Sequence, residues 1–342
     1  MSIINIEEKL QMPEYDFLRT NVNLGKNIFL LGYGGSHAYG TNNENSDIDI
    51  RGIATNSKRN ILTGTDFEQV VDVVTDTTIY SFDKIIKLLC SCNPNTVEIL
   101  GLKPEHYIYL SPIGEMLIKN RHLFLSKRAV HSFGGYANSQ LRRLESKSAR
   151  LVSQSQMEQY ILRSIEHASV DFKNRYFDMP EDSIKLYIDK SPREDYDTEI
   201  FCDVTLKHYP LRDHKGMLND MGTIIKQYAK MGKRNSKALD KGKLAKHMCH
   251  LIRLYLMAFD ILENGEIVTY RDKEHNFLMD IRNGKYLEDE QKPTKEFYDI
   301  VDEYENKLNK LRNTTNLPEL PDMNKIMKLV EEVNYGVVIE KD

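Results

Sequence analysis

Several features that would place this chain in a specialised class are missing from its 342 residues. Four cysteines are too few for a disulfide framework, and the pair Cys90 and Cys92 has the wrong spacing for a zinc knuckle. No apolar run approaches the roughly 18 residues that a membrane helix needs. The first residues show no basic leader followed by a long apolar stretch, and no repeat or low-complexity tract is present. We therefore expect a globular protein of the reduced cytoplasm, with no membrane partner.

A strong excess of charge of one sign is also absent. The chain has 47 Lys and Arg against 51 Asp and Glu, and its net charge of −4 argues against a strong non-specific binder of nucleic acid. The charge is nevertheless uneven. Segment 119–175 has eleven Lys and Arg against four Asp and Glu, and segment 226–253 has nine against one. These basic segments favour a polyanionic acceptor such as RNA, although solvated helix faces explain either segment alone equally well.

Two carboxylates at alternate positions, Asp47 and Asp49, are the most informative feature that is present. Side chains of a strand alternate between its faces, so the run 46–52, read as a strand, would project both acids from one side. Carboxylates that close repel each other unless a cation lies between them, and hard oxygen ligands suit Mg²⁺ or Mn²⁺. Upstream, Gly35 and Ser36 follow an apolar strand pattern. This order indicates a glycine turn where backbone N–H groups meet a phosphate and Ser36 caps a helix.

These motifs resemble the nucleotidyltransferase superfamily of the DNA polymerase β type, whose mark is Gly-Ser followed at a distance by Asp-x-Asp. The similarity extends to a predicted nucleotidyltransferase family that includes the polymerase-β-like proteins associated with RNA ligases in RNA repair. The matching parts of this sequence are segments 36–40, 46–52 and 93–100, and the positions Lys243, His247, His250, Arg253 and Gly265. The resemblance therefore covers both halves of the chain, and its most specific motifs lie between residues 34 and 98.

The resemblance implies roles for individual residues. It makes Asp47, Asp49 and Asp76 the catalytic, metal-binding carboxylates, because Asp76 has the family's spacing to Lys84 and to the Asn-Pro motif at 93–94. Asp72, which lies between valines, is the alternative third carboxylate. Nucleotide binding is implied for Gly35, Ser36, His37, Arg51, Lys84, Lys243, His247 and Arg253.

Some of these assignments have alternatives. The family pattern has an arginine where this chain has His37, so the charge at that position depends on pH. Arg51 can pair with the carboxylates or with a phosphate. His247 and Arg253 belong to a cationic stripe on one flank of a helix over 244–262, and surface decoration explains that stripe as well as phosphate contact does.

The patterns also predict the fold. Strand patterns cover 27–33, 48–54, 67–74 and 77–80, and helical patterns cover 81–89 and 94–100, which suggests a small mixed sheet with helices on one side. Beyond residue 112 helical patterns dominate, notably at 244–262, 294–311 and 323–333, apart from an irregular stretch between Pro180 and Pro192 and one strand near 199–206. We predict an α+β protein with a nucleotidyltransferase catalytic domain at 1–120 and a mostly helical domain at 121–342 that binds acceptor or nucleotide.

The predicted reaction moves a nucleoside monophosphate from a nucleoside triphosphate to a hydroxyl group and releases pyrophosphate. RNA, such as a tRNA or a broken 3′ end, is the first acceptor to consider. The second reading keeps the chemistry and transfers the nucleotide to a protein side chain or a small molecule. The third is a non-catalytic regulator that binds nucleotide or RNA on a retained fold. The choice of base, the number of nucleotides added and the oligomeric state stay open.

Overall fold

The computed structural model describes residues 6–44, 46–149, 158–159, 162–163, 183–192, 198–231, 241–288 and 292–339. The chain forms two compact units. The first comprises Met1–Ala137, Cys249–Asn283 and Glu296–Asp342, and the second comprises Asn138–Met248 and Gly284–Lys295. These units differ from the predicted segments 1–120 and 121–342, because helical parts from the second half of the sequence pack with the N-terminal part.

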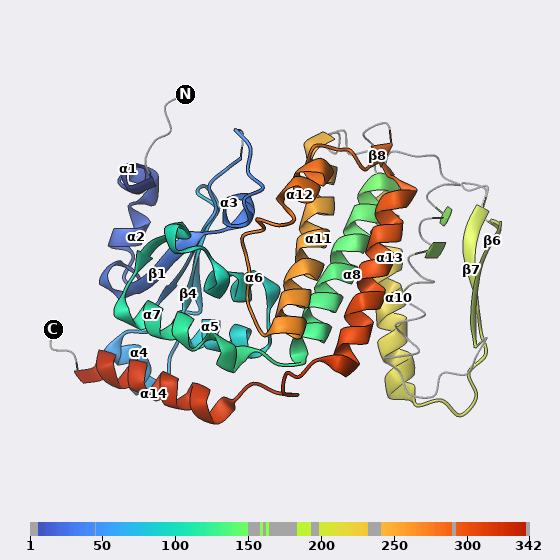
Figure 1. The fold of residues 1–342 in the computed structure, drawn as a ribbon. Helices are drawn as coiled ribbons and strands as arrows, with labels where there is room; N and C mark the ends of the chain where they lie inside the picture. Colours follow the sequence, from blue (N-terminus) through green and yellow to red (C-terminus); the bar gives the residue numbers. More distant parts are fainter. Residues whose placement is uncertain are drawn as a thin grey trace. The chain divides into compact units, whose positions relative to one another are not determined.

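A five-stranded mixed sheet lies within the first unit (Figure 1). Its strands are β1 (Ile28–Tyr33), β2 (Ile50–Ala54), β3 (Gln69–Asp72), β4 (Thr77–Ser81) and β5 (Tyr107–Leu110). They lie in the order β3–β4–β2–β1–β5; β2 and β4 are parallel, and all other neighbours are antiparallel. The mixed sheet and the many helices confirm the predicted α+β fold. The four-residue edge strand β5 is one that the sequence patterns did not indicate.

Helices surround this sheet and continue through the rest of the chain. Those with bounds inside the described residues are α1 (Ile6–Leu10), α2 (Phe17–Thr20), α3 (Gly35–Tyr39), α4 (Lys58–Thr63), α5 (Phe82–Cys90), α6 (Pro94–Val97), α7 (Pro112–Lys119), α8 (Arg128–Ala149), α10 (Leu211–Met231), α11 (Lys241–Asn264), α12 (His275–Arg282), α13 (Lys295–Thr314) and α14 (Met323–Ile339). Local sequence explains several helix starts. The Ser81 hydroxyl accepts the Lys84 N–H to cap α5, and Asn93 caps α6, in which Pro94 occupies the first turn.

Both faces of the central strands β1 and β2 are largely buried. Leu31 and Ile50 point to one face, where they share a core with Leu18 of α2. Leu30 and Ile53 alternate with them, point to the opposite face and are fully buried as well. The prediction of helices on one side only is therefore wrong. The continuous apolar run of β1 is the pattern of a strand that is covered on both faces, whereas a strand with one solvated face alternates.

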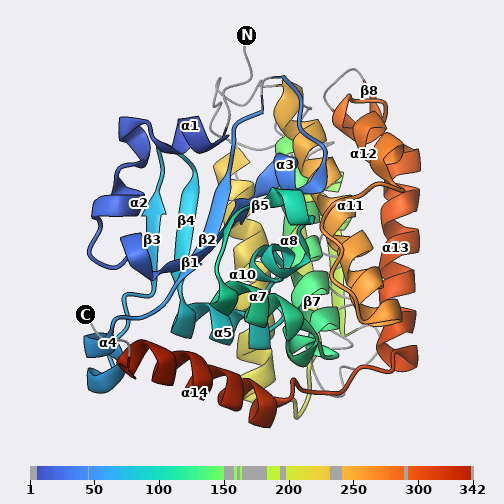
Figure 2. The same cartoon turned by 60° about the vertical axis from the view of Figure 1, so that its left-hand side comes forward.

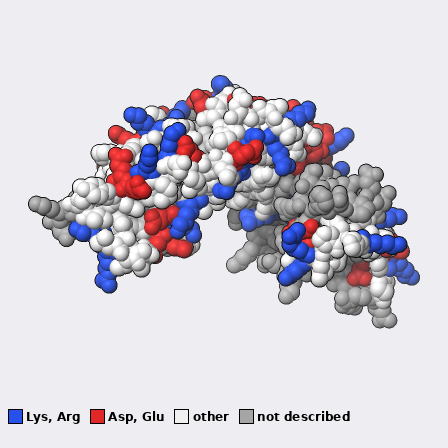
Figure 3. Space-filling view, turned by 90° about the horizontal axis from the view of Figure 1, so that it is seen from below, with Lys and Arg blue, Asp and Glu red and all other residues white. Residues whose placement is uncertain are grey.

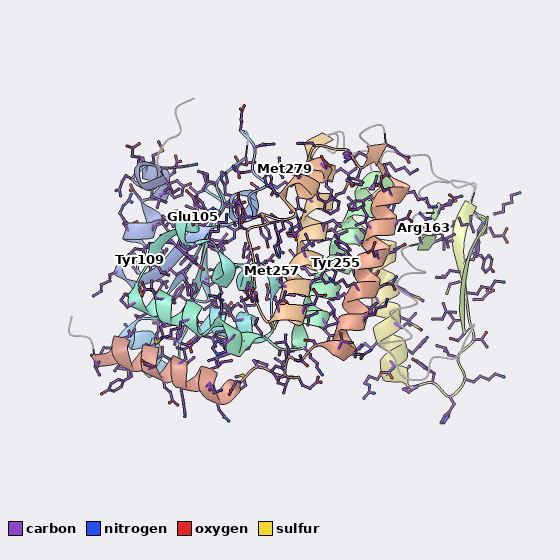
Figure 4. All side chains as sticks on the ribbon, viewed as in Figure 1. Glu105, Tyr109, Arg163, Tyr255, Met257 and Met279 are labelled. Atoms are coloured by element: carbon purple, nitrogen blue, oxygen red, sulfur yellow. The ribbon has the colours of Figure 1, made fainter. Side chains whose placement is uncertain are left out.

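The helices at the end of the chain pack inside the first unit. Figures 1 and 2 both show α14 beside α4, and these two helices are in contact. On α11, Tyr255 and Met257 (Figure 4) are buried, and the ring of Phe259 meets Tyr304 of α13 edge-on at 5.3 Å. The Thr315 hydroxyl, which follows α13, donates a 2.6 Å hydrogen bond to the Leu262 carbonyl of α11. These contacts bring residues 249–283 and 296–342 into the first unit.

The second unit contains a β-hairpin and parts of the long helices. Strands β6 (Ile184–Lys190) and β7 (Thr198–Val204) pair antiparallel over their whole lengths, and β8 (Leu287–Glu288) pairs with β9 (Lys292–Pro293). The strand predicted near 199–206 is thus present. The stretch between Pro180 and Pro192 contains β6, so the prediction of an irregular stretch there is wrong. The charged residues of β6 obscure its alternating pattern. Within the described residues, no helix has both the length and the apolar character needed to cross a membrane.

Candidate active site

Two of the predicted carboxylates flank neighbouring strand ends at one edge of the sheet. Asp49 precedes β2 and Asp76 precedes β4, whose first residues, Ile50 and Thr77, are paired in register. The Gly34 N–H donates to the Asp49 carbonyl at 2.8 Å, and the Ile50 N–H donates to the Asp76 carbonyl at 3.4 Å. These bonds extend both ladders by one residue. The sheet therefore brings Asp49 and Asp76 side by side although they are 27 positions apart in the sequence.

The strand that carries the Asp-x-Asp motif begins later than predicted. β2 starts at Ile50, so Asp47 and Asp49 lie just before it. Asp47 is exposed, whereas Asp49 is partly buried. The ladder stops at Asp49 because its neighbour Gly34 is the last residue of β1's extension, and the chain then turns into α3. Asp47 is consequently placed by the preceding loop and Asp49 by the sheet.

The glycine turn is shaped around the Asp49 carboxylate. Gly35 has φ +53°, a left-handed conformation that favours glycine. A Cβ atom at Gly35 would lie 1.6 Å from Asp49 Oδ2, and one at Gly34 would lie 2.9 Å from Arg51 Cγ. Only residues without a side chain allow Asp49 and Arg51 to cross the turn so closely. The close approach of Asp49 to the turn therefore requires glycine at position 35, which explains the predicted association of Gly35 with the acidic motif.

Ser36 does not cap the helix as expected. The extended residue Gly34 occupies the N-cap position of α3 and no side chain caps it, so Ser36 is the second helical residue and is buried. The Ser36 carbonyl accepts the Thr41 N–H at 2.9 Å, and Gly40, with φ 72°, ends the helix. Ser36 thus belongs to a single tight turn of helix whose start is set by the glycine before it.

His37 lies on the far side of this turn in an aromatic cluster. Its ring stacks on Tyr33 at 5.8 Å, and Tyr33 also meets His106 edge-on at 5.7 Å. Burial lowers the pKa of His37, an effect partly opposed by a hydrogen bond with the Ser46 backbone, and burial likewise lowers the pKa of His106. At neutral pH the His37 position therefore carries no positive charge, unlike the arginine of the family pattern.

This cluster predicts a loss of stability in mild acid. The unfolded chain binds a proton at each imidazole near pH 6.5, whereas the folded chain resists protonation there, so lowering the pH below about 6.5 favours unfolding, by at most about 1.4 kcal/mol per pH unit for each histidine. We expect His37→Phe, which keeps the stacked ring, to flatten the fall in urea unfolding free energy between pH 7 and pH 5. His131→Phe, at an exposed position of α8, is the control and should keep the wild-type slope. An unchanged slope in His37→Phe would show that His37 titrates normally.

Arg51 and Asp76 form an ion pair at the sheet edge. Arg51 Nη2 lies 3.3 Å from Asp76 Oδ1, and Arg51 Nη1 donates to the backbone carbonyls of Asp76 at 2.6 Å and Ile50 at 3.0 Å. These bonds hold Asp76 in a left-handed conformation, φ +46°. Of the two roles open to Arg51, this arrangement uses the one in which it pairs with a carboxylate.

Asp72 is engaged in closing a turn. Its Oδ2 accepts the Thr75 N–H and the Thr75 hydroxyl, each at 2.8 Å, where the chain passes from β3 to β4. Both bonds stabilise a local turn in the manner typical of aspartate. Asp76 lies beside Asp49 and is more exposed, and its assignment as the third carboxylate stays a prediction.

Arg253 reaches the glycine turn from α11. The side chain is only 8% exposed, and its Nη1 donates to the Gly35 carbonyl at 3.4 Å. Its guanidinium carbon lies 3.6 Å from the centre of the Tyr39 ring. Arg253 thus contacts the glycine turn although it is 218 positions from Gly35 in the sequence.

The other predicted nucleotide contacts are Lys84, Lys243 and His247. Lys84 follows the opposite end of β4 and pairs with Glu68 at 3.1 Å. His247 belongs to the second unit. The side chain of Lys243 lies outside the described residues. The proposed contacts of these three residues with nucleotide stay predictions.

Two residues at the site, Arg282 and Arg271, had no signal in the sequence, and a third, Tyr39, lies in the matching segment 36–40 but had no assigned role. Arg282, the last residue of α12, donates to the Ser46 hydroxyl at 3.3 Å, directly before Asp47. The Arg271 side chain is 3% exposed and pairs with Asp260, while its N–H donates to the Tyr39 carbonyl. Tyr39 itself is buried. Since these contacts join segments far apart in the chain, no local spacing could have identified them.

The predicted RNA-binding segments are only partly described. In 119–175, Lys127 pairs with Glu319 at 2.6 Å and Arg128 donates to the Cys90 carbonyl, while Arg150 and most residues after it lie outside the described residues. In 226–253, the side chains at 226–243 are likewise not described. On the face drawn in Figure 3, the described Lys and Arg side chains lie among Asp and Glu side chains.

The donor set at the sheet edge has the chemistry of a Mg²⁺ or Mn²⁺ site. Asp47, Asp49 and Asp76 offer carboxylate oxygens, the ligands that these hard ions prefer. In the described part of the chain, no three His, Cys, Asp or Glu side chains are grouped closely enough to hold a metal ion. The residues fit such an ion in ligand type but not in their spacing in this structure, and Arg51 supplies positive charge beside Asp76.

Comparison with known proteins agrees with this geometry. A sequence model of the RNA repair pathway DNA polymerase beta family matches residues 6–170, which is 165 of the 342 residues and includes the whole sheet and the glycine turn. An "Uncharacterized 38.9 kDa protein in nrdC-mobD intergenic region" of Enterobacteria phage T4 is 25% identical over 307 residues, covering 80% of this chain and 87% of the relative. No solved structure matches. This match confirms, over residues 6–170, the resemblance to the nucleotidyltransferase superfamily of the polymerase β type.

Proposed function

We propose that this protein is a nucleotidyltransferase that moves a nucleoside monophosphate from a nucleoside triphosphate to a hydroxyl group of RNA. The observation that carries the proposal is the placement of Asp49, which sits on Gly35 on one side and beside Asp76 on the other. A carboxylate fixed between a glycine turn and a second acid has no packing role that a neutral residue would not fill better.

The reaction balances as an in-line displacement. The acceptor hydroxyl oxygen forms a bond to the α-phosphorus, the bond from that phosphorus to the bridging oxygen breaks, and pyrophosphate leaves with the electron pair. Divalent ions, held by Asp47, Asp49 and Asp76, would supply charge stabilisation and lower the pKa of the attacking hydroxyl. The hydroxyl proton would pass to Asp76 or to water.

The RNA acceptor is supported by the family's place in RNA repair and by the two basic segments. The decisive experiment incubates the full-length chain with each α-labelled nucleoside triphosphate, Mg²⁺ or Mn²⁺, and either total RNA or total protein. RNA labelling that requires metal and is lost on chelation supports the proposal. Labelling of protein alone transfers the role to protein nucleotidylation. Binding of nucleotide without release of pyrophosphate, with any acceptor, would mean a non-catalytic regulator.

The third carboxylate gives a separate prediction. We expect Asp76→Asn to lower kcat about 30-fold, since an amide keeps an oxygen ligand but loses its charge and proton affinity. Asp72→Asn should change kcat less than about 3-fold and lower stability by about 1 kcal/mol, because it weakens the bonds to Thr75. Single-turnover rates and thermal unfolding measure the two effects. If Asp72→Asn were the slower enzyme, the assignment of the two residues would be reversed.

A further inference from the structure

Arg253 is a buried cation that is held by unusual partners. Within the described residues no carboxylate lies at ion-pair distance from it, although it is 8% exposed. Its guanidinium instead contacts the Gly35 carbonyl, the face of the Tyr39 ring and the imidazole of His250. Burying a cation is costly unless its environment compensates. The compensation here comes entirely from groups that belong to the glycine turn or support it.

The two contacts on α3 span the whole turn. Gly35 is its first residue and Tyr39 is its last, so one guanidinium fixes both ends. The opposite side of Gly35 faces the Asp49 carboxylate. A shift of Arg253 would therefore move the turn relative to Asp49. Each Nη group already makes one hydrogen bond, Nε has no partner among the described residues, and the side chain is only 8% exposed, which leaves it poorly placed to meet a phosphate directly.

His250 fixes Arg253 from behind. Its Nδ1 lies 2.8 Å from Arg253 Nη2. A guanidinium only donates hydrogen bonds, so His250 must accept through an unprotonated Nδ1. The His250 ring also meets Tyr136 of α8 edge-on at 5.9 Å, and the Tyr136 hydroxyl accepts from the Asn95 amide at 3.3 Å. Segment 93–100 thus supports the His250 imidazole through Asn95 and Tyr136.

Glu98, from the same motif, holds the other side of the turn. The Tyr39 hydroxyl donates to Glu98 Oε2 at 2.6 Å, and the Glu98 carbonyl accepts from the Thr269 hydroxyl at 2.7 Å. Tyr39 is therefore held through its ring by Arg253 and through its hydroxyl by Glu98. Segments 93–98, 250–253 and 269 converge on one turn of five residues.

We infer that Arg253 is a positioning residue, which holds the Gly35 turn in place beside Asp49 rather than binding nucleotide. The acceptor nitrogen of His250 orients its guanidinium. The inference rests on the proposed function for its effect on catalysis, but its structural part stands alone. It also assigns a structural role to segment 93–98, which supports the contacts of Arg253 through Tyr136 on one side and through Tyr39 on the other.

The test compares Arg253→Lys, His250→Asn and His250→Leu. Lysine keeps the charge but cannot span three partners. Asparagine keeps an acceptor oxygen near the Nδ1 position, whereas leucine has none. Hydrogen exchange of the Ala38, Gly40 and Thr41 amides, whose bonds close the turn, is measured without nucleotide. We expect exchange at least about 10-fold faster in Arg253→Lys and His250→Leu, and within about 3-fold of wild type in His250→Asn.

Kinetics provide the second readout. Arg253→Lys and His250→Leu should lower kcat about 10-fold with KM changed less than about 3-fold, because the geometry of Asp49 is altered and not the nucleotide contacts. A raised KM with unchanged exchange would overturn the inference and make Arg253 a direct ligand of nucleotide. If His250→Asn and His250→Leu gave the same exchange rates and the same kcat, His250 would have no part in orienting Arg253. If no acceptor is ever labelled, the exchange rates still decide the structural part. Exchange in α14 is the control for global unfolding.

Discussion

Asp49→Asn is expected to lower kcat at least about 1000-fold, which corresponds to about 4 kcal/mol of transition-state stabilisation. The substitution keeps the size of the side chain and its place on Gly35 but removes the charge that would hold both metal ions. Because the backbone bond from Gly34 to the Asp49 carbonyl does not involve the side chain, the sheet edge should be unchanged. Rapid-quench measurement of nucleotide transfer gives the rate, and thermal unfolding gives the stability.

The matched control for Asp49 is Asp16→Asn. Asp16 is an exposed aspartate of the same unit and pairs with Arg19, three residues away. It should keep wild-type kcat and change the free energy of unfolding by less than about 0.5 kcal/mol. If Asp49→Asn retained more than about a tenth of the wild-type rate while staying folded, the carboxylate could not be the principal metal ligand, and the proposed mechanism would fail.

Gly35→Ala is expected to lower kcat at least about 100-fold. Two costs combine at this position. A side chain at φ +53° costs about 1–2 kcal/mol of stability. The new methyl group would also lie 1.6 Å from Asp49 Oδ2, so the carboxylate must move by more than 1 Å, and a displacement of that size costs about 100-fold in rate. Nucleotide transfer and urea unfolding measure the two costs separately.

Gly64→Ala separates conformational strain from the steric clash. Gly64 ends α4 with φ +67°, yet a Cβ atom there would meet nothing within 4 Å. This variant should lose about the same stability as Gly35→Ala through backbone strain and keep its activity. Equal activity of the two variants would mean that Asp49 does not need the space above Gly35.

Local chemistry in the sequence was enough to predict much of this protein. The apolar run of β1, the Ser81 and Asn93 caps and the three- and four-residue spacing of α11 each depend on residues close together in the chain. The spacing of Gly35 to Asp47 and Asp49 indicated their association for the same reason. Boundaries were less secure: β2 begins at Ile50 only because the turn after Gly34 leaves the ladder there.

The choice among charged residues needed tertiary contacts. Asp72 and Asp76 are similar in sequence context, but only Asp76 meets Arg51 and adjoins Asp49, while Asp72 binds Thr75. Lys84 matched the family spacing, yet it pairs with Glu68 beyond the other end of β4. Spacing in the sequence does not determine which neighbour a long, flexible side chain contacts in the folded protein.

The sequence by itself determined the polymerase-β-like motif, the α+β class and the helices of the second half, because these follow from patterns that repeat within a few residues. Only the tertiary structure decided that Arg253 holds the Gly35 turn, that Arg282 reaches the loop before Asp47, and that the last helices join the first unit. Those contacts join residues up to 236 positions apart. They form because burial of apolar side chains within the first unit brings the charged groups together, and which segments pack against one another has no local signature.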